Sequence, residues 1–255
     1  MIELLVLGGL ALGAMGLGRF QRRHLIRQHE EFLASLSDEA QVVLHVANHE
    51  AVTRRQPFTV AHLAYGLLQD EAFAAAIKQL GGEPEELETI IQTSLDRGVP
   101  VPQHGNIPEA LIVIAHAAAT AQFAQRKATC ADLYGQLVRT KGRALFEHVS
   151  FTAADLLFLL IHGAPPPPPV LPGERDVLVI LRNDDFTTRE LVVRLLIDVF
   201  ELEPNEATRV MVAANDDGRC VVGRFASDIA RRKIEDARST AALQGAPLWI
   251  GVEPA

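Results

Sequence analysis

The chain has 255 residues, which is enough for two domains of ordinary size, each with its own hydrophobic core. Its formal net charge of -8 at pH 7 argues against a nucleic-acid-binding protein. Its two cysteines, Cys130 and Cys220, are too few for a disulfide framework or a cysteine metal cluster, and they suit a reducing compartment.

The chain begins with an uncharged, mostly apolar run from Leu4 to Gly18, which is followed by Arg19, Arg22 and Arg23. A cleaved signal peptide carries its positive charges before the apolar run, so the order here is reversed. At about 1.5 Å per residue the run spans roughly 23 Å, against about 30 Å for a hydrocarbon core. Two interpretations stay open: a helix packed on protein, or a membrane anchor at residues 1–23 with everything after it in the cytoplasm.

An internal repeat occupies residues 37–163. When the sequence is shifted by 70 positions, Glu39 falls on Glu109 and, with no gap between, Leu67 falls on Leu137. A long fixed period indicates a duplicated supersecondary unit, and the apolar spacing within each copy is helical. We therefore predict two four-helix units that pack together through small residues, which in the first copy are Ala40, Ala47 and Ala51.

The first copy carries Thr-x-x-His-Leu-x-x-x-Leu-Leu at Thr59–Leu68, where the threonine predicts a helix N-cap. With its Glu-Ala helix start, the repeat resembles the N-terminal domain of Clp-family AAA+ unfoldases, the paired Clp repeat. That resemblance implies a domain that docks adaptors and substrates and does no chemistry. The second copy is degenerate, because Asp132 replaces the histidine and Arg143 stands where Phe73 predicts an apolar residue.

Residues 164–173 contain five consecutive prolines. Such a run favours an extended polyproline II rod of about 3.1 Å per residue. We predict a linker between two domains; the alternative is a proline-rich ligand for a partner domain.

Residues 174–255 predict a small α/β domain with the order β-α-α-β-α-β, a three-stranded antiparallel sheet covered by helices. The chain as a whole is therefore predicted to be multidomain: residues 1–36, an all-α double four-helix domain, a linker, and this domain. The expected elements are strands at Asp176–Leu181, Arg219–Gly223 and Leu248–Val252, a helix opened by a capping box at Thr187 and Glu190, a helix from Pro204 to about Ala214, and a long helix at Ser227–Gln244.

Four short runs in this part resemble ClpS, and the match is ungapped over about Glu174–Pro254. ClpS proteins bind the free α-amino group and the large hydrophobic first side chain of a substrate, which together form an N-degron, and pass the substrate to the ClpA unfoldase. The resemblance implies an adaptor that is not an enzyme and needs no cofactor, with a ClpA-like AAA+ unfoldase and substrates with hydrophobic N-terminal residues as partners. The runs are R-N-D-D-F-T at Arg182–Thr187, A-T-R-V-M at Ala207–Met211, G-R-C-V-V-G at Gly218–Gly223 and P-L at Pro247–Leu248.

An α-ammonium group carries three donors and a charge, so its site needs clustered acceptors. The resemblance places Asn183 and Asp184 in that role, with Asp185 bracing the loop. The alternative is that this run only forms a turn and a charged helix start. An apolar pit for the first side chain is expected from Val192, Leu195 and Met211, with Thr187 at its rim.

Three positions depart from the ClpS pattern, so the preferred first residue is not predicted. Asn215 stands in place of a histidine that helps to hold the α-amino group, Arg189 in place of a bulky apolar gate residue, and Ala214 in place of a valine. Asp228 and Lys233 correspond to the positions that contact the unfoldase in ClpS. A solvated helix face is the alternative for these two.

Other signals point to no chemistry. His45 and His49 have the spacing of two metal ligands on one helix, but no third ligand is evident. The sequence contains neither a phosphate-binding Gly-x-x-x-x-Gly-Lys-Ser/Thr loop nor a Gly-x-Ser-x-Gly motif, which argues against an ATPase or a hydrolase. A second hypothesis is a membrane-tethered scaffold or anti-adaptor that regulates Clp proteins without binding degrons. The expected location is cytoplasmic, at the inner face of the membrane if the anchor interpretation holds.

Overall fold

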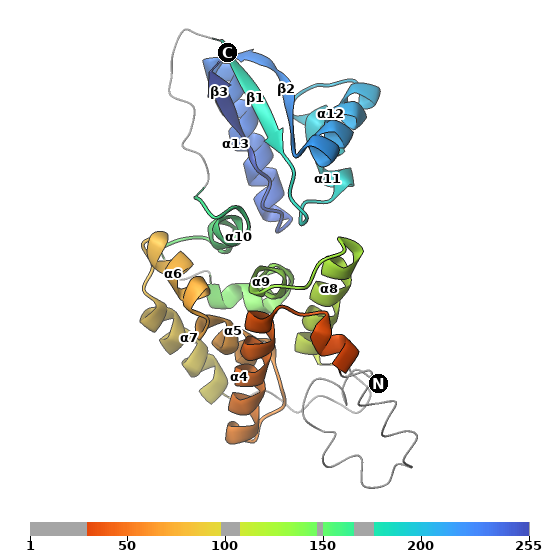
Figure 1. Cartoon of the computed structure of the whole chain (residues 1–255). Helices are drawn as coiled ribbons and strands as arrows, with labels where there is room; N and C mark the ends of the chain where they lie inside the picture. The colour runs from red at the N-terminus through yellow and green to blue at the C-terminus, as the bar shows by residue number, and fades with distance from the viewer. Residues whose placement is uncertain (1–29, 98–107, 147–149, 166–175, 255) are drawn as a thin grey trace. The chain divides into compact units, whose positions relative to one another are not determined.

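The computed structural model describes residues 30–97, 108–146, 150–165 and 176–254 (Figure 1). The contacts within the chain divide it into two compact units, Met1–Ala153 and Ala154–Ala255. The anchor predicted for residues 1–23 lies outside the described residues, and so does most of the proline-rich segment. Both therefore stay predictions. No helix in the described ranges combines the length and hydropathy that crossing a bilayer requires.

The two repeats are all-helical and confirm the predicted duplication. In the second repeat the third element is a 3-10 helix, and at its start the Thr140 hydroxyl accepts a hydrogen bond from Gly142 N at 3.1 Å. The first repeat consists of α4 (Asp38–Arg54), α5 (Val60–Leu68), α6 (Glu71–Gln79) and α7 (Pro84–Asp96), and the second of α8 (Glu109–Phe123), α9 (Cys130–Leu137), η2 (Lys141–Phe146) and α10 (Ala153–His162).

The last of these helices, α10, is grouped by its contacts with the second unit. Within that unit, His162 Nε2 lies 2.7 Å from the carbonyl oxygen of Pro247. The division between the units thus falls at Ala153–Ala154, at the start of α10. The domain boundary predicted in residues 164–173 stays a prediction.

Helices α4 and α5 approach each other closely. Ala40 and Ala47 are fully buried, as predicted from their small size. Gly66 on α5 allows the same approach, because a Cβ atom there would lie 2.4 Å from the carbonyl oxygen of Val43. A glycine that seems misplaced inside a helix is therefore required by packing.

The second unit contains a three-stranded sheet of order β2-β1-β3, antiparallel throughout, with β1 in the centre (Figure 1). Helix α12 contacts β1 and β2, and α13 contacts all three strands. The predicted order β-α-α-β-α-β is confirmed. The elements are β1 (Asp176–Arg182), α11 (Arg189–Asp198), α12 (Pro204–Asp217), β2 (Arg219–Ala226), α13 (Ser227–Leu243) and β3 (Ile250–Pro254).

Two predicted element starts in this unit are wrong. The N-cap of α11 is Thr188, whose hydroxyl accepts a hydrogen bond from Leu191 N at 3.3 Å, and not Thr187. The last strand begins at Ile250 rather than Leu248, and Trp249 O accepts a hydrogen bond from Arg182 N at 3.1 Å. Both errors shift an element end by only one or two residues, so the topology is unaffected.

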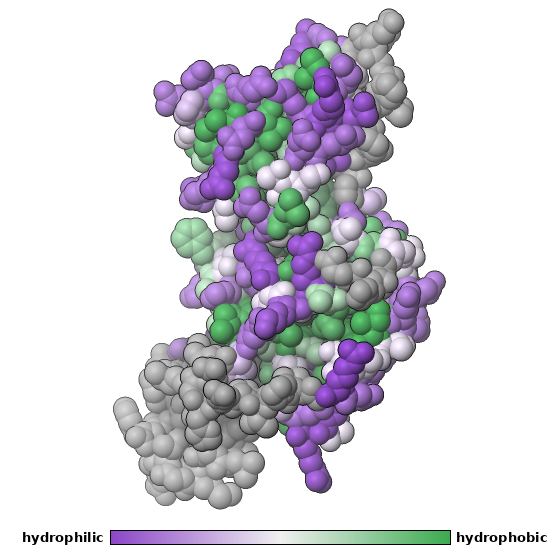
Figure 2. All heavy atoms as spheres, turned by 180° about the vertical axis from the view of Figure 1, so that it is seen from behind, coloured by the Kyte–Doolittle hydropathy of each residue, from purple (hydrophilic) through white to green (hydrophobic). Residues whose placement is uncertain are grey.

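Hydrophilic side chains cover much of the face seen in Figure 2, and apolar side chains show between them in smaller areas. Large apolar side chains that are exposed include Val42 and Val52 on α4, which are 62% and 64% exposed. Single exposed apolar residues are common on protein surfaces. An exposed apolar side chain that lines a hollow, as Val42 does, is of more interest for binding.

Candidate functional site

The loop between β1 and α11 is organised around one carboxylate. Asp184 Oδ1 accepts hydrogen bonds from Phe186 N at 2.8 Å and Thr187 N at 2.6 Å, and its Oδ2 accepts one from Thr187 Oγ1 at 2.8 Å. Asp184, predicted as a ligand of the α-ammonium group, thus also braces the loop. The physical reason is the position of Asp184 two and three residues before the amides that it accepts from, which is the geometry of an Asx-type turn.

Two effects of the environment change the pKa of Asp184 in opposite directions. Burial raises the pKa of its carboxyl group, while hydrogen bonds from Thr187 and Phe186 oppose the rise by stabilising the ionised form. A carboxylate offers about four lone-pair sites, and three are used within the loop. One acceptor site of the carboxylate is left for a ligand, and the other three hold the loop.

The loop is also attached to the end of α12. Asn183 N donates to Gly218 O at 2.9 Å, and Gly218 ends that helix with a positive φ of 77°. Near the same end, Asn215 Oδ1 accepts a hydrogen bond from Arg189 Nη2 at 3.2 Å, while its Nδ2 donates to Asp216 Oδ1 at 3.0 Å. The structure therefore joins Asn183 to the C-terminal end of α12 and Arg189 to Asn215 near that end, although Arg189 and Asn215 are far apart in the sequence.

The three residues predicted to line the apolar pit, together with Ala214, all belong to one hydrophobic cluster. Leu195 on α11 and Ala214 on α12 are buried in it, while Val192 and Met211 are half-buried and pack against it. The two helices contact each other directly. Apolar side chains of both helices thus meet in one cluster.

The two residues predicted to contact an unfoldase differ in their surroundings. Asp228 is an exposed residue that pairs with Arg232 one helical turn away, at 3.9 Å. Lys233 Nζ, in contrast, donates to Val199 O at 2.6 Å and to Glu201 Oε1 at 3.1 Å. Lys233 therefore ties α13 to the C-terminal end of α11, and this internal role was missed because it joins residues that are distant in the sequence.

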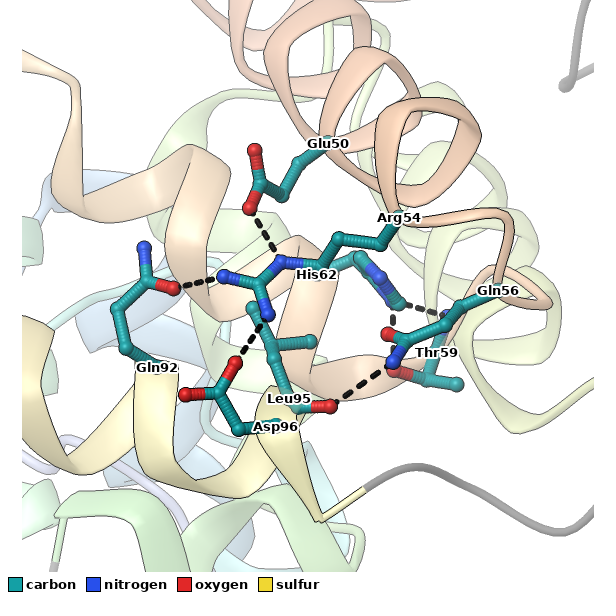
Figure 3. A network of polar contacts seen from close by, with 8 residues as sticks. All are labelled: Glu50, Arg54, Gln56, Thr59, His62, Gln92, Leu95 and Asp96. Carbon is teal, nitrogen blue, oxygen red and sulfur yellow. Dashed lines mark hydrogen bonds and ion pairs between the residues drawn. The ribbon is translucent and has the colours of Figure 1, made fainter.

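A polar network in the first repeat was also missed by sequence reasoning (Figure 3). Arg54 near the end of α4 contacts Glu50 on the same helix and Gln92 and Asp96 on α7. The spacing of Glu50 and Arg54 is a sequence signal for one of these pairs, but the partners on α7 depend on packing. The network links α4 to α7, so it supports the fold of the repeat rather than a reaction.

Known families match both parts of the chain. The family described as ATP-dependent Clp protease adaptor protein ClpS matches residues 173–251, and the Clp repeat N-terminal domain matches residues 35–129. ClpS 1 of Rhodopseudomonas palustris is 43% identical over 76 residues, which are 30% of this chain and 74% of that protein. ClpS of Acetivibrio thermocellus is 45% identical over 76 residues, or 30% of this chain and 77% of its own length.

A solved structure is similar to the same part of the chain. Agrobacterium tumefaciens ClpS2, bound to L-phenylalaninamide, is 35% identical in sequence. The similarity covers 32% of this chain and 100% of that one, with a TM-score of 0.32.

Proposed function

The chain belongs to the ClpS family of ATP-dependent Clp protease adaptors, and we propose that its C-terminal domain binds the N-terminal residue of substrate proteins for delivery to a Clp unfoldase. The bound group is a free α-ammonium with a hydrophobic side chain. The domain acts by binding and performs no reaction on the substrate.

The observation that carries this proposal is the loop held by Asp184 at the end of the α11–α12 pair. That loop presents the exposed residues Asn183 and Asp185, and it lies beside Asn215. The amide and carboxylate oxygens of these side chains are suitable acceptors for an ammonium group. The half-buried residues Val192 and Met211 supply apolar contact for the first side chain.

Arg189 modifies this site. Its guanidinium group already donates to Asn215 Oδ1, so a ligand ammonium has to displace it or bind through the other acceptors. Displacement exchanges one hydrogen bond for another and adds charge repulsion between two cations. We therefore expect the N-terminal residue to be held mainly through Asn183, and Arg189→Met to tighten binding.

The test is a titration of the full-length chain with two fluorescent peptides that begin with Phe, one with a free amine and one acetylated. The free peptide is expected to bind and the acetylated one not, because acetylation removes the charge and two of the three donors. Asn183→Ala should weaken binding of the free peptide roughly tenfold to hundredfold, the effect of losing a hydrogen bond to a charged group. Asn205→Ala, an exposed asparagine near the start of α12, is the matched control and should bind normally. Equal binding of both peptides contradicts the proposal.

One observation favours a second candidate function, that of a scaffold or anti-adaptor. The matched ClpS relatives align with about 30% of this chain, and a separate region of it matches the Clp repeat domain. Combined with the contact of Arg189 and Asn215, this fits a protein that binds other Clp components without taking a degron. The titration separates the two: a scaffold binds neither peptide but is captured by a Clp unfoldase.

A further inference from the structure

The first repeat contains a groove of about 620 Å³ between α4 and the α5–α6 connection. Its floor is apolar, formed by Val42, Val43 and Val46 on one side of α4, and Gly66 completes it from α5. Val42 is 62% exposed there, although burying its side chain against a partner would be favourable. The floor thus offers an unused apolar surface in a hollow of ligand-binding size.

The rim of the groove is acidic. Glu39 in the first turn of α4 and Glu71 in the first turn of α6 are exposed, and Asp70 lies between α5 and α6. Asp70 Oδ1 accepts a hydrogen bond from Phe73 N at 2.8 Å, so this residue also caps α6. The pKa of Glu39 is lowered by hydrogen bonds from its own backbone amide and from Ser37, with a smaller effect of Lys127.

The same place in the second repeat has different chemistry. Shifting by 70 positions puts Arg139 on Gln69, Thr140 on Asp70 and Lys141 on Glu71, and Gln136 on Gly66. The fold of the repeat therefore does not require acidic residues at positions 70 and 71, whereas Gly66 is required in the first repeat by the close approach of α4. Their combination in the first repeat alone makes that groove both open and negatively charged.

We propose that this groove binds a segment of a partner protein in which an apolar side chain is flanked by lysine or arginine. The apolar side chain lies on the valine floor, and the flanking cations pair with Glu39, Asp70 and Glu71. Complementary charge of this kind sets the orientation and speeds the association. The site is independent of the one proposed in the C-terminal domain, because it requires no free α-amino group.

The experiment titrates the full-length chain with fluorescein-labelled acetyl-Lys-Arg-Leu-Leu-Arg-Lys-amide, whose blocked N-terminus excludes the degron site. We expect saturable binding that Val42→Asp and the double change Glu39→Gln with Glu71→Gln each weaken at least tenfold. Val52→Asp is the matched control, since Val52 lies on the same helix, is 64% exposed and is not among the residues that line the groove. It should bind as the unchanged chain does. The two glutamates are exposed, so the double variant keeps the proposal testable even if Val42→Asp disturbs the fold.

Three results would overturn the proposal. Equal binding of a peptide with serine in place of both leucines would mean that the chain attracts cations only through its general negative charge. Equal loss in Val42→Asp and Val52→Asp would place the binding outside the groove. Binding that appears only after Arg19, Arg22, Arg23 and Arg27 are all changed to serine would mean that the chain's own basic segment fills the groove.

Discussion

The two repeats use one backbone frame and different chemistry at the cap of their second helix. In the first, Thr59 N donates to His62 Nδ1 at 3.2 Å, and the threonine hydroxyl lies 2.8 Å from the same nitrogen. In the second, Thr129 N and its hydroxyl donate to Asp132 Oδ2 at 2.8 and 2.9 Å. An imidazole and a carboxylate thus accept a hydrogen bond from the equivalent N-cap amide of each repeat, because the cap requires an acceptor at that place and not a particular residue.

The difference in charge has a consequence elsewhere in each repeat. Asp132 is almost fully buried and pairs with Arg126, whose two terminal nitrogens lie 2.7 and 2.9 Å from its oxygens. The position equivalent to Arg126 in the first repeat is Gln56, which donates instead to Leu95 O at 2.9 Å. A neutral histidine needs no counter-charge, whereas a buried carboxylate does. The partner residue therefore changes together with the cap.

The cores of the repeats also differ. Phe73 from the first repeat packs edge-on against Tyr134 and Phe146 from the second, with centroids 5.2 and 6.4 Å away. The equivalents of these three positions are Arg143, Ala64 and Ala76, so no matching cluster exists on the other side of the pseudo-symmetry. The duplication supplied a frame, and one shared aromatic cluster joins its halves.

The largest effect is expected for this cluster. Phe73→Ala should lower the free energy of unfolding by about 3–5 kcal/mol, because it removes a fully buried aromatic ring and leaves a cavity. Arg143→Ala, at the equivalent half-exposed position, should cost less than about 1 kcal/mol. Urea denaturation of both full-length variants measures the difference. Similar losses would mean that the repeats are equivalent in their cores after all.

The cap histidine predicts a dependence on pH. Burial lowers the pKa of His62 from 6.5 to about 4, so between these values the unfolded chain binds a proton that the folded chain does not. Stability should therefore fall as the pH drops from 6.5 to 4, by about 3 kcal/mol in total, and this term should be constant above 6.5. His62→Gln retains a cap acceptor and should remove this term from the stability curve, while the exposed His49→Gln should leave it unchanged.

The smallest of the three effects is expected for the second cap. Arg126→Ala leaves the buried Asp132 with only its bonds to Thr129 and should lower the free energy of unfolding by about 2 kcal/mol at neutral pH. The loss is smaller than for a fully buried ion pair because the side chain of Arg126 is 27% exposed. Changing Arg126→Gln together with Asp132→His copies the first cap and should recover most of the loss. Failure of that double change to recover stability would show that the two caps are not interchangeable.

The sequence by itself determined much of the architecture. The 70-residue period indicated the duplicated helical unit, Thr59 and His62 indicated its cap, and the apolar runs after residue 174 indicated the order β-α-α-β-α-β. These features are local: periodicity, cap residues and turn residues act within a few positions of the chain. The ClpS family was indicated separately, by the resemblance of four short sequence runs that include Arg182–Thr187.

Only the tertiary structure decided what individual polar side chains do. Asp184 holds the loop between β1 and α11, and Lys233 ties α13 to α11. Arg189 donates a hydrogen bond to the side-chain oxygen of Asn215. The tertiary structure also packs Gly66 against α4, and next to this contact lies the groove with the apolar floor and the acidic rim. Such partners come from distant parts of the chain, and a charged or polar side chain of one type can brace, bind or pair. Which of these it does depends on the donors and acceptors that packing places within about 3 Å of it.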